Sequence, residues 1–509
     1  MKLFNVSLPA GVVEKLRPHQ IPATQHLLQV LKAKGYALCG DDTGVGKTYE
    51  AAAIATALNV PTLAVVPKIS VTAWHRVADY LGTSFSVINP EMLRTGRTLY
   101  GWWDNTPPAG FECESRLKCV WCMCWVDLDN PQPCHANHTG IHCAEWIKKP
   151  WKYGHFHWHP NIKFLIVDEA HRFGGLDSLN SEMLIAAKRD RIPALALTAT
   201  PAVTPLNLRA LGYLLGLHTL VGDETGFYAW ARKHGCRRDM KWGGWKFFGS
   251  REAQMANMLE LHSEIFPACG SRIRTKDIPG FPDRTIAAEL YDIKESGRID
   301  ELYREMRAAI DALHAMKLDD KAPDHPLTKI LRARQEIELL KVPIVVELVR
   351  DYLAKGLSVA VFINFEATMK ELRRRLQCNC YIDGTQTGAP AKRQKCIDDF
   401  EDDRERVILV NNDAGGVSVS LHDVRGEFPR VGLVMPAPSA VKMRQVFGRL
   451  PREGGRSPAL YRVLFVAGTV EMPLQRSLAG KLDNLDALTD ADWDPMNLRI
   501  NGQPTLQAA

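Results

Sequence analysis

One stretch of the chain combines glycine, lysine and threonine in a spacing that can bind phosphate. Residues 40–48 read Gly-Asp-Asp-Thr-Gly-Val-Gly-Lys-Thr, between an apolar run at 36–39 and a helical run at 49–58. Gly44 and Gly46 would let backbone N–H groups curve around an anion at the helix N-terminus. Lys47 would reach the β- and γ-phosphates, and the Thr48 hydroxyl would hold Mg²⁺. An ordinary glycine turn is the alternative, since Asp41 stands where the general motif has glycine.

A pair of acidic residues marks the end of a second predicted strand. Phe164 to Val167 is a continuous apolar run, as expected for a strand buried on both faces of a parallel sheet, and Asp168 and Glu169 follow it. Ligands of α/β sheets bind at the carboxyl ends of such strands. Asp168 is predicted to hold Mg²⁺, and Glu169 to orient and activate the attacking water. The alternative is a helix N-cap followed by a first-turn acid.

Two further motifs would complete a site for ATP hydrolysis. The apolar run 194–197 ends in Thr198-Ala199-Thr200-Pro201, whose hydroxyls could couple nucleotide state to a neighbouring domain; a threonine-rich turn is the alternative. Arg449 and Arg452 are three residues apart and share a helix face or turn edge. Arginines delivered across a domain cleft can stabilise charge on a transferring phosphoryl group, although two arginines alone are usually surface residues.

Cysteines and histidines are concentrated between residues 113 and 143, within a segment that has no helical or strand periodicity. Cys119 and Cys122 have the spacing of half a tetrahedral zinc site, and metal binding would supply the folding energy that a small core cannot. We expect Cys134 and Cys143 to complete the site. Four further residues are candidate ligands: Cys113, Cys124, His138 and His142. They leave open which four residues bind the zinc and whether a second zinc is bound. Buried free thiols with exposed histidines are the alternative.

Alternating strands and helices predict an α/β protein with two parallel-sheet lobes. We expect residues 1–205 to form the first lobe, which contains the zinc insert at 96–160. Residues 206–325 are expected to be a helical and aromatic insertion with a linker, and residues 326–509 to form the second lobe.

The composition is that of an ordinary globular protein, with 46% hydrophobic and 24% charged residues. The net charge of +6 permits nucleic-acid binding without requiring it. The sequence contains no run of eighteen apolar residues and no signal-peptide core near Met1, which predicts a cytoplasmic protein without a membrane partner.

Taken in order, these motifs resemble those of superfamily 2 helicases, and more narrowly the SNF2-like translocases. Leu16 to Gln20 resembles their adenine motif, and Asp41 matches a position where that group also carries aspartate. The second half is similar to their second lobe in Ile382 to Thr385, Arg393-Gln394, Phe400 and Ala414 to Val417. A narrower likeness to HARP-like annealing helicases lies in His234 to Cys236, Trp242, Gly249-Ser250 and Arg272 to Asp277.

The resemblance implies two RecA-like lobes with ATP between them and assigns roles to individual residues. It implies Lys47, Asp168, Glu169, Arg449 and Arg452 as catalytic residues. Nucleotide binding would involve Arg17, Gln20, Asp42, Thr43, Gly44, Val45, Gly46, Lys47 and Thr48. Coupling between ATP and nucleic acid would involve His171, Thr198, Thr200, Gly416 and Gln445.

The function predicted from this resemblance is an ATP-dependent translocase on duplex or forked DNA, which remodels forks or anneals strands in replication or repair. Its partner would be duplex, forked or single-stranded DNA. It would use ATP, Mg²⁺ and Zn²⁺, and its zinc insert could contact replication proteins. The compact chain would suit a phage or a bacterium, acting in the bacterial or host-cell cytoplasm. Two alternatives remain: a strand-separating 3′–5′ replicative helicase of a phage, and a nucleic-acid-binding scaffold built around the zinc insert with a weak ATPase.

Overall fold

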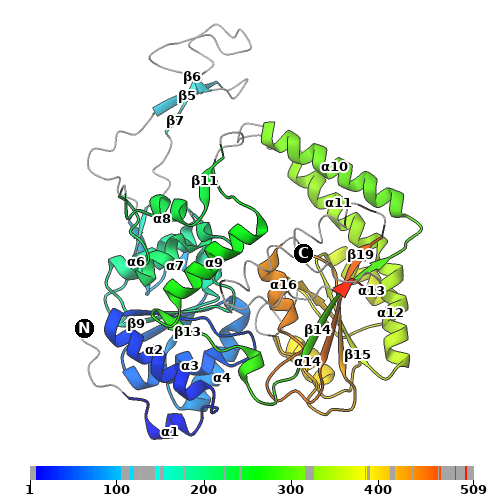
Figure 1. Cartoon of the computed structure of the whole chain (residues 1–509), viewed down its shortest axis with the longest axis horizontal. Helices are drawn as coiled ribbons and strands as arrows, with labels where there is room; N and C mark the ends of the chain where they lie inside the picture. Colours follow the sequence, from blue (N-terminus) through cyan, green and yellow to red (C-terminus); the bar gives the residue numbers. More distant parts are fainter. Residues whose placement is uncertain are drawn as a thin grey trace.

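The chain forms two α/β lobes, seen in the computed structural model of Figure 1. The described residues are 7–104, 154–176, 178–222, 224–239, 244–315, 326–384, 386, 390–412, 419–437, 439–467, 469, 471 and 488, together with four short backbone strands. These strands are β5 (Ser115–Cys119), β6 (Trp125–Val126), β7 (Ala144–Lys148) and β20 (Arg499–Ile500).

The first lobe contains a six-stranded parallel sheet. Its strand order is β13 (Gly270–Ser271), β1 (Tyr36–Cys39), β10 (Ala194–Leu197), β9 (Phe164–Asp168), β2 (Thr62–Val65) and β3 (Ser86–Ile88). The central strands β2, β9 and β10 are apolar apart from Thr62 and Asp168, and buried apart from Asp168, because helices cover both faces. These helices include α2 (Gln20–Lys34), α3 (Lys47–Leu58), α4 (Val71–Leu81), α6 (Leu179–Arg189) and α7 (Arg209–Leu215).

The second lobe contains a seven-stranded parallel sheet. Its strand order is β16 (Tyr381–Ile382), β17 (Val407–Asn411), β15 (Ser358–Ile363), β18 (Arg430–Val434), β19 (Ala459–Val466), β14 (Arg284–Tyr291) and β20. Its helices are α10 (Ser296–Ala315), α11 (Pro326–Leu340), α12 (Val342–Ala354), α13 (Glu366–Leu376), α14 (Pro390–Glu401) and α16 (Ala440–Phe447). The two parallel-sheet lobes confirm the predicted fold class at this level.

The segment 206–325, expected as an insertion and linker, contributes a strand to each sheet. It first adds α8 (Phe227–Lys233), the antiparallel hairpin of β11 (Cys236–Arg238) and β12 (Trp245–Phe247), and α9 (Arg251–Ile265). It then supplies β13 to the first sheet and β14 to the second. The crossing from lobe to lobe therefore lies between residues 271 and 284.

The cysteine-rich segment leaves the first lobe through a two-stranded stem. β4 (Gly101–Asp104) pairs antiparallel with β8 (His155–Trp158), and Phe156 and Trp158 are buried in the core of the lobe. The stem places both ends of the segment at one point on the lobe, which is what a compact insert requires. In the described part of the chain, no helix is both long and apolar enough to cross a membrane.

Candidate active site

The phosphate-binding loop lies between β1 and α3, as its sequence predicts. Gly44 and Gly46 have φ values of +95° and +98°, a conformation that glycine adopts without strain. A Cβ at Gly46 would also overlap the side-chain nitrogen of Gln20. Lys47 Nζ donates to the carbonyl oxygens of Asp41 and Asp42, at 2.9 Å each. Since an ammonium group has three donors, one remains for a phosphate oxygen.

Asp41 and Asp42 fasten this loop to the end of β13. Asp41 is fully buried, and its Oδ1 accepts hydrogen bonds from Ser271 Oγ at 3.1 Å and from the Ile273 backbone at 2.8 Å. Asp42 Oδ1 accepts from Arg272 at 2.8 Å. Burial alone would raise the pKa of Asp42, but the guanidinium groups of Arg272 and Arg444 hold it well below its usual range. The loop is therefore held by ion pairing from outside the motif.

The acidic pair lies at the carboxyl end of β9, where its oxygens are already oriented. Asp168 accepts hydrogen bonds from Trp74 Nε1 at 3.0 Å and from the Glu169 backbone N–H at 2.9 Å. Burial and the neighbouring Glu169 carboxylate raise the pKa of Asp168 to about 6. Burial would also raise the pKa of Glu169, but His171, Lys47 and Arg449 together lower it to about 2. Glu169 is thus the firmly ionised member of the pair at neutral pH.

Arg449 and Arg452 come from the second lobe, directly after α16. Both donate to the Val419 carbonyl oxygen, at 3.3 Å each. Burial, together with repulsion from Arg449, lowers the pKa of Arg452 to about 9. A buried cation, Arg449, beside a partly buried one, Arg452, would be stabilised by an anion, so this pair has the chemistry of a phosphate site.

The second lobe contacts the phosphate loop directly. A Cβ at Gly448 would lie 2.6 Å from Thr43 Cβ, and a Cβ at Gly44 would lie 2.9 Å from Arg452 Cδ. Arg444 of α16 approaches Asp42 Oδ1 to 3.3 Å. The lobes therefore meet at the loop itself.

A second contact between the lobes involves the predicted adenine motif. Arg17 and His19 both pair with Glu453 of the second lobe, and Arg17 approaches its carboxylate to 2.7 Å. Gln20 Nε2 donates to the Val45 carbonyl oxygen at 3.0 Å, and Gln20 Oε1 accepts from the Arg17 backbone. The nitrogen of the Gln20 amide thus holds the phosphate loop, and its oxygen holds the predicted adenine motif. Recognition of adenine by Gln20 stays a prediction.

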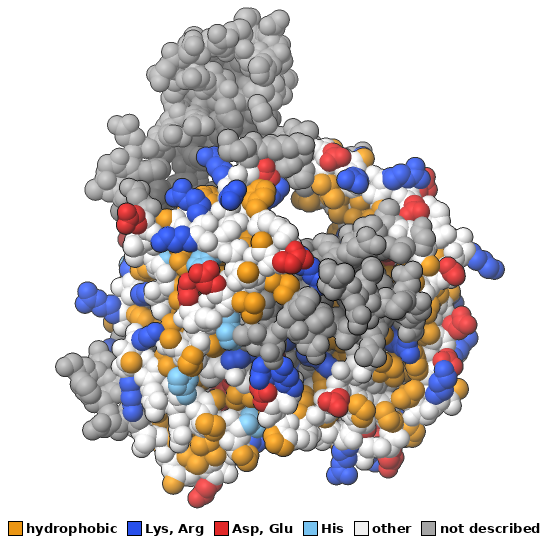
Figure 2. Space-filling view, viewed as in Figure 1, with side chains coloured by type: hydrophobic (Ala, Val, Ile, Leu, Met, Phe, Trp, Pro, Cys, Tyr) orange, Lys and Arg blue, Asp and Glu red, His pale blue; other side chains and the backbone are white. Residues whose placement is uncertain are grey.

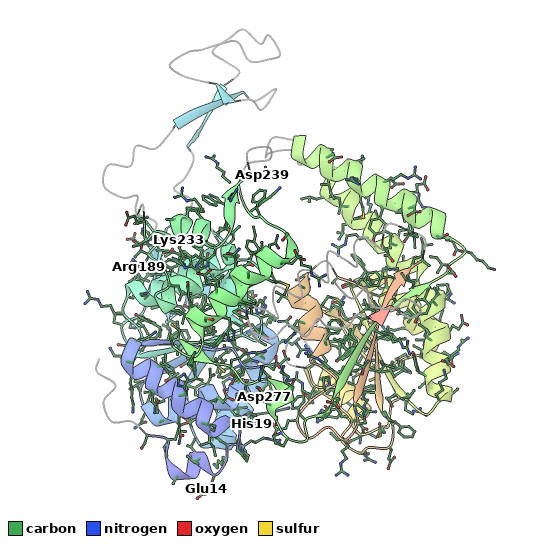
Figure 3. All side chains as sticks on the ribbon, viewed as in Figure 1. Glu14, His19, Arg189, Lys233, Asp239 and Asp277 are labelled. Atoms are coloured by element: carbon green, nitrogen blue, oxygen red, sulfur yellow. The ribbon has the colours of Figure 1, made fainter. Side chains whose placement is uncertain are left out.

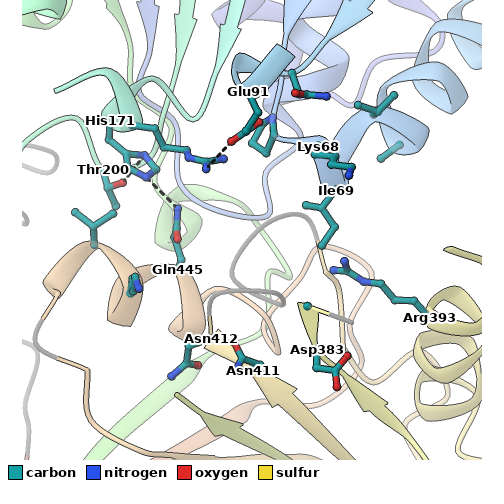
Figure 4. Close-up of a pocket in the computed structure, with 18 of the residues that line it drawn as sticks. Lys68, Ile69, Glu91, His171, Thr200, Asp383, Arg393, Asn411, Asn412 and Gln445 are labelled. Carbon is teal, nitrogen blue, oxygen red and sulfur yellow. Dashed lines mark hydrogen bonds and ion pairs between the residues drawn. The ribbon is translucent and has the colours of Figure 1, made fainter. Parts of the chain in front are cut away.

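A chain of polar side chains connects the acidic pair to the second lobe, and Figure 4 shows three of its members, His171, Thr200 and Gln445. His171 Nδ1 lies 3.3 Å from Glu169 Oε2 and 3.1 Å from Thr198 Oγ1. Thr200 Oγ1 lies 3.3 Å from the same nitrogen. Gln445 Nε2 of α16 lies 3.3 Å from Glu169 Oε2 and 3.4 Å from His171 Nε2. Residues from three motifs of the sequence therefore meet at the His171 ring.

The donor set of the first lobe fits a nucleotide with Mg²⁺. Thr48 is partly exposed, and its hydroxyl forms no hydrogen bond with any residue that the structure describes. Asp168 supplies carboxylate oxygens, the ligand type that Mg²⁺ prefers. Repulsion from Glu169 is one cause of the raised pKa of Asp168, and a bound cation would relieve it.

Comparison with known proteins identifies the family of the chain. No family model matches the chain. A protein of Acanthamoeba polyphaga mimivirus, named "Putative ATP-dependent RNA helicase L364", is 30% identical over 513 residues, covering 98% of this chain and 88% of the viral protein. The chain belongs to this ATP-dependent helicase family. Among solved structures, the Sulfolobus solfataricus SWI2/SNF2 ATPase core in complex with double-stranded DNA is similar at 15% identity, with a TM-score of 0.35. That match covers 96% of this chain and 99% of the other.

In this helicase, most of the predicted site residues lie around the phosphate loop. Lys47, Thr48, Asp168 and Glu169 come from the first lobe, and Arg449 and Arg452 face them from the second. Of the predicted coupling residues, Gly416 lies outside the described residues. Among the predicted zinc ligands only the backbone of Cys119 is described, at the end of β5. The other predicted ligands lie outside the described residues: Cys122, Cys134 and Cys143, and the alternates Cys113, Cys124, His138 and His142.

Several residues that build the site of this helicase were given no role in the site from its sequence. Trp74 orients Asp168, and Arg272 and Arg444 hold Asp42. Arg272 belongs to a basic cluster of the kind that usually forms a solvated face, whereas here its side chain is 6% exposed. The one signal for Arg444 was its position directly before Gln445.

Proposed function

We propose that this helicase is an ATP-dependent translocase that moves along duplex or forked DNA. The proposal rests on three side chains that belong both to a cavity between the lobes and to the polar chain at the acidic pair. His171, Thr200 and Gln445 line a cavity of about 1410 Å³ between the lobes, and the same residues form the polar chain that ends at Glu169. A ligand in the cavity and a nucleotide at the phosphate loop would therefore act on the same hydrogen bonds.

The walls of the cavity have the chemistry of a nucleic-acid backbone site. Both lobes contribute basic side chains to its lining: Lys68, Arg76, Arg172, Arg393 and Lys442. Asn411 and Asn412 at the end of β17 add amide groups (Figure 4). Contacts of this kind fix register on the phosphate backbone and carry little sequence information. We expect tight binding at low salt with little sequence preference.

In the proposed reaction, Lys47 and the loop backbone bind the β- and γ-phosphates. Thr48 and Asp168 would hold Mg²⁺, which neutralises charge on the phosphates when it is bound. Glu169, charged and held by His171 and Gln445, orients the attacking water. Arg449 and Arg452 stabilise the charge on the transferred group from the second lobe. Hydrolysis would release the lobes from each other, and repeated closing and opening would step the protein along its track.

We propose more specifically that the translocase remodels forks or anneals strands, as HARP-like enzymes do. This role rests on the sequence resemblance at His234 to Cys236 and Arg272 to Asp277. A second candidate is a strand-separating helicase that acts on RNA. The name of the mimiviral relative favours this candidate. The two proposals differ in displacement of a labelled strand from a tailed duplex, which only the second requires.

The test is ATP hydrolysis by the purified protein alone and with single-stranded DNA, duplex DNA, forked DNA or RNA. Stimulation chiefly by duplex or forked DNA supports the translocase, and stimulation by RNA alone supports the second candidate. Glu169→Gln is the matched control, because it keeps the size of the side chain and removes its charge. It should bind ATP while turnover falls by about 10²- to 10⁴-fold. Turnover close to wild type would refute the role of Glu169.

We also propose that the cysteine-rich insert binds zinc through Cys119, Cys122, Cys134 and Cys143, with the insert as a contact site for replication proteins. The stem of β4 and β8 supports a compact insert, since it brings the two ends of the segment together. Metal analysis of the purified protein should find about one zinc per chain, and Cys122→Ser should reduce it. Protein without zinc after purification in the absence of chelators would refute the site.

A further inference from the structure

We propose that the first lobe has a second nucleic-acid contact, outside the cavity between the lobes. It lies on α8 and the β11–β12 hairpin and binds the backbone of a single strand. The proposal rests on the proposed function, because the forked DNA of that function would supply the single strand. We call this region the hairpin surface and define it by Tyr228, Arg232, Lys233, Arg237, Arg238, Trp245 and Phe248.

The hairpin surface is basic, and its cations are exposed. Arg232, Lys233, Arg237 and Arg238 are all exposed, and within the described residues their side chains form no hydrogen bond or ion pair. The nearby acidic groups form no ion pair with these four cations. Asp239 pairs with Lys246, and Glu260 and Glu264 of α9 lie 3.8 Å and 3.4 Å from the ring of His234. Figure 2 shows basic side chains gathered on this part of the face, and Figure 3 labels Lys233 and Asp239 there.

The hairpin backbone places like charges opposite each other. Arg237 pairs directly with Lys246 across the two strands. Directly opposed like charges destabilise an antiparallel pair, and Asp239 pairs with Lys246, whereas Arg237 has no ion pair among the described residues. A phosphate bound beside Arg237 would supply the counter-charge.

Aromatic rings lie among these cations. The rings of Tyr228 and Trp245 stack at 4.7 Å with an interplanar angle of 21°. Tyr228 is 39% exposed and Phe248 is 42% exposed. Cations that follow a backbone, together with exposed rings on which bases stack, are the combination that binds single strands without sequence preference. An acidic protein would use the charges but would gain less from open ring faces, so nucleic acid is the favoured partner.

The hairpin surface is continuous with the rim of the cavity. β12 packs against the short helix η4 (Pro205–Leu208), and Asn207 of η4 lines the cavity together with Thr200 and Val203. β11 stands at the upper edge of the first lobe in Figure 1. A strand that leaves the cavity over η4 therefore reaches the hairpin next.

The test measures binding of labelled single-stranded DNA, single-stranded RNA and duplex DNA by fluorescence anisotropy, without ATP, over a series of salt concentrations. The variant Arg237→Ala/Arg238→Ala removes two exposed charges. The control Arg350→Ala/Lys355→Ala removes two exposed charges at the C-terminal end of α12, in the second lobe. For two lost phosphate contacts, the slope of log K against log salt should become shallower by about 1.4 for single strands. Only the hairpin variant should show this change.

Phe248→Ala is an independent variant that keeps every charge. It should weaken single-strand binding by about 5-fold or more, with the salt slope unchanged. Basal ATP hydrolysis should stay at the wild-type level in both hairpin variants, because none of these residues contacts the nucleotide site.

The outcomes separate this proposal from the proposed function. If the wild type binds the strands and is stimulated by them, but the hairpin and control variants share its salt slope, the hairpin proposal alone is overturned. If the hairpin variant loses binding to a labelled poly-glutamate peptide while binding strands normally, the surface binds acidic protein instead, and the proposal is again overturned. A wild type that neither binds nor responds to any strand overturns both.

Discussion

Gly448 is the residue at which the approach of the two lobes can be tested most directly. Its backbone has φ −97° and ψ 11°, a conformation open to any residue, so glycine is not needed there for its flexibility. It is needed for space, because a Cβ would lie 2.6 Å from Cβ and 2.7 Å from Cγ2 of Thr43 in the phosphate loop. Gly448→Ala therefore forces the second lobe away from the loop without straining α16.

The size of the effect follows from this distance. Carbon atoms in contact are about 3.5–4.0 Å apart, so the alanine variant must move the lobes apart by roughly 1 Å at this point. Arg449 follows immediately and would move with the backbone. Misplacing a catalytic group by about 1 Å costs on the order of 100-fold in rate, or about 2.7 kcal/mol of transition-state stabilisation. The core of each lobe is untouched, so the melting temperature should change little.

The assay is nucleic-acid-stimulated ATP hydrolysis, with nucleotide binding measured separately. Gly448→Ala should lower kcat about 100-fold and leave the affinity for ATP nearly unchanged. Thr43→Gly in the same chain removes the clashing atoms and should restore part of the activity, whereas Thr43→Ala keeps the Cβ and should restore less. A Gly448→Ala enzyme with wild-type kcat would show that the lobes need not approach this closely during turnover.

Three further outcomes follow from the same contacts. Gln445→Ala removes the side chain that donates to Glu169 and His171. Basal ATP hydrolysis should stay within a few-fold of wild type, while its stimulation by nucleic acid disappears. Equal loss of the basal and stimulated rates would contradict a coupling role for Gln445. Asp42→Asn removes the carboxylate that faces the buried Arg272, so it should lower the free energy of unfolding by about 3–5 kcal/mol in urea titrations. An unchanged unfolding midpoint would contradict this expectation. The guanidinium groups hold the pKa of Asp42 well below 3.8, so its ionic contribution to stability is complete above that pH and is lost as the pH falls through the lowered folded value. Unfolding measured from pH 5 downward should therefore show a shallower acid limb in Asp42→Asn than in the wild type.

Local patterns in the sequence predict those parts of the site that are built from a few consecutive residues. The glycines of the phosphate loop need a particular backbone conformation, and the apolar run before Asp168 needs burial on both faces. Both requirements are visible in residue types alone, as is the alternation that predicted two parallel-sheet lobes. The strands at 36–39, 62–65, 164–168, 194–197, 358–363, 407–411 and 430–434 follow the same logic.

The tertiary structure decided which charges meet. Asp42 and Arg444 are 402 positions apart, and Asp41 and Ser271 are 230 apart, so no periodicity connects them. Arg272 looks like a surface residue in sequence, and it is buried only because the two-residue strand β13 joins the edge of the first sheet. A strand that short has no pattern of its own, and its place is set by backbone pairing with β1. The chemistry of the phosphate loop is therefore determined by consecutive residues of the sequence. Its anchoring and its contact with the second lobe depend on long-range packing.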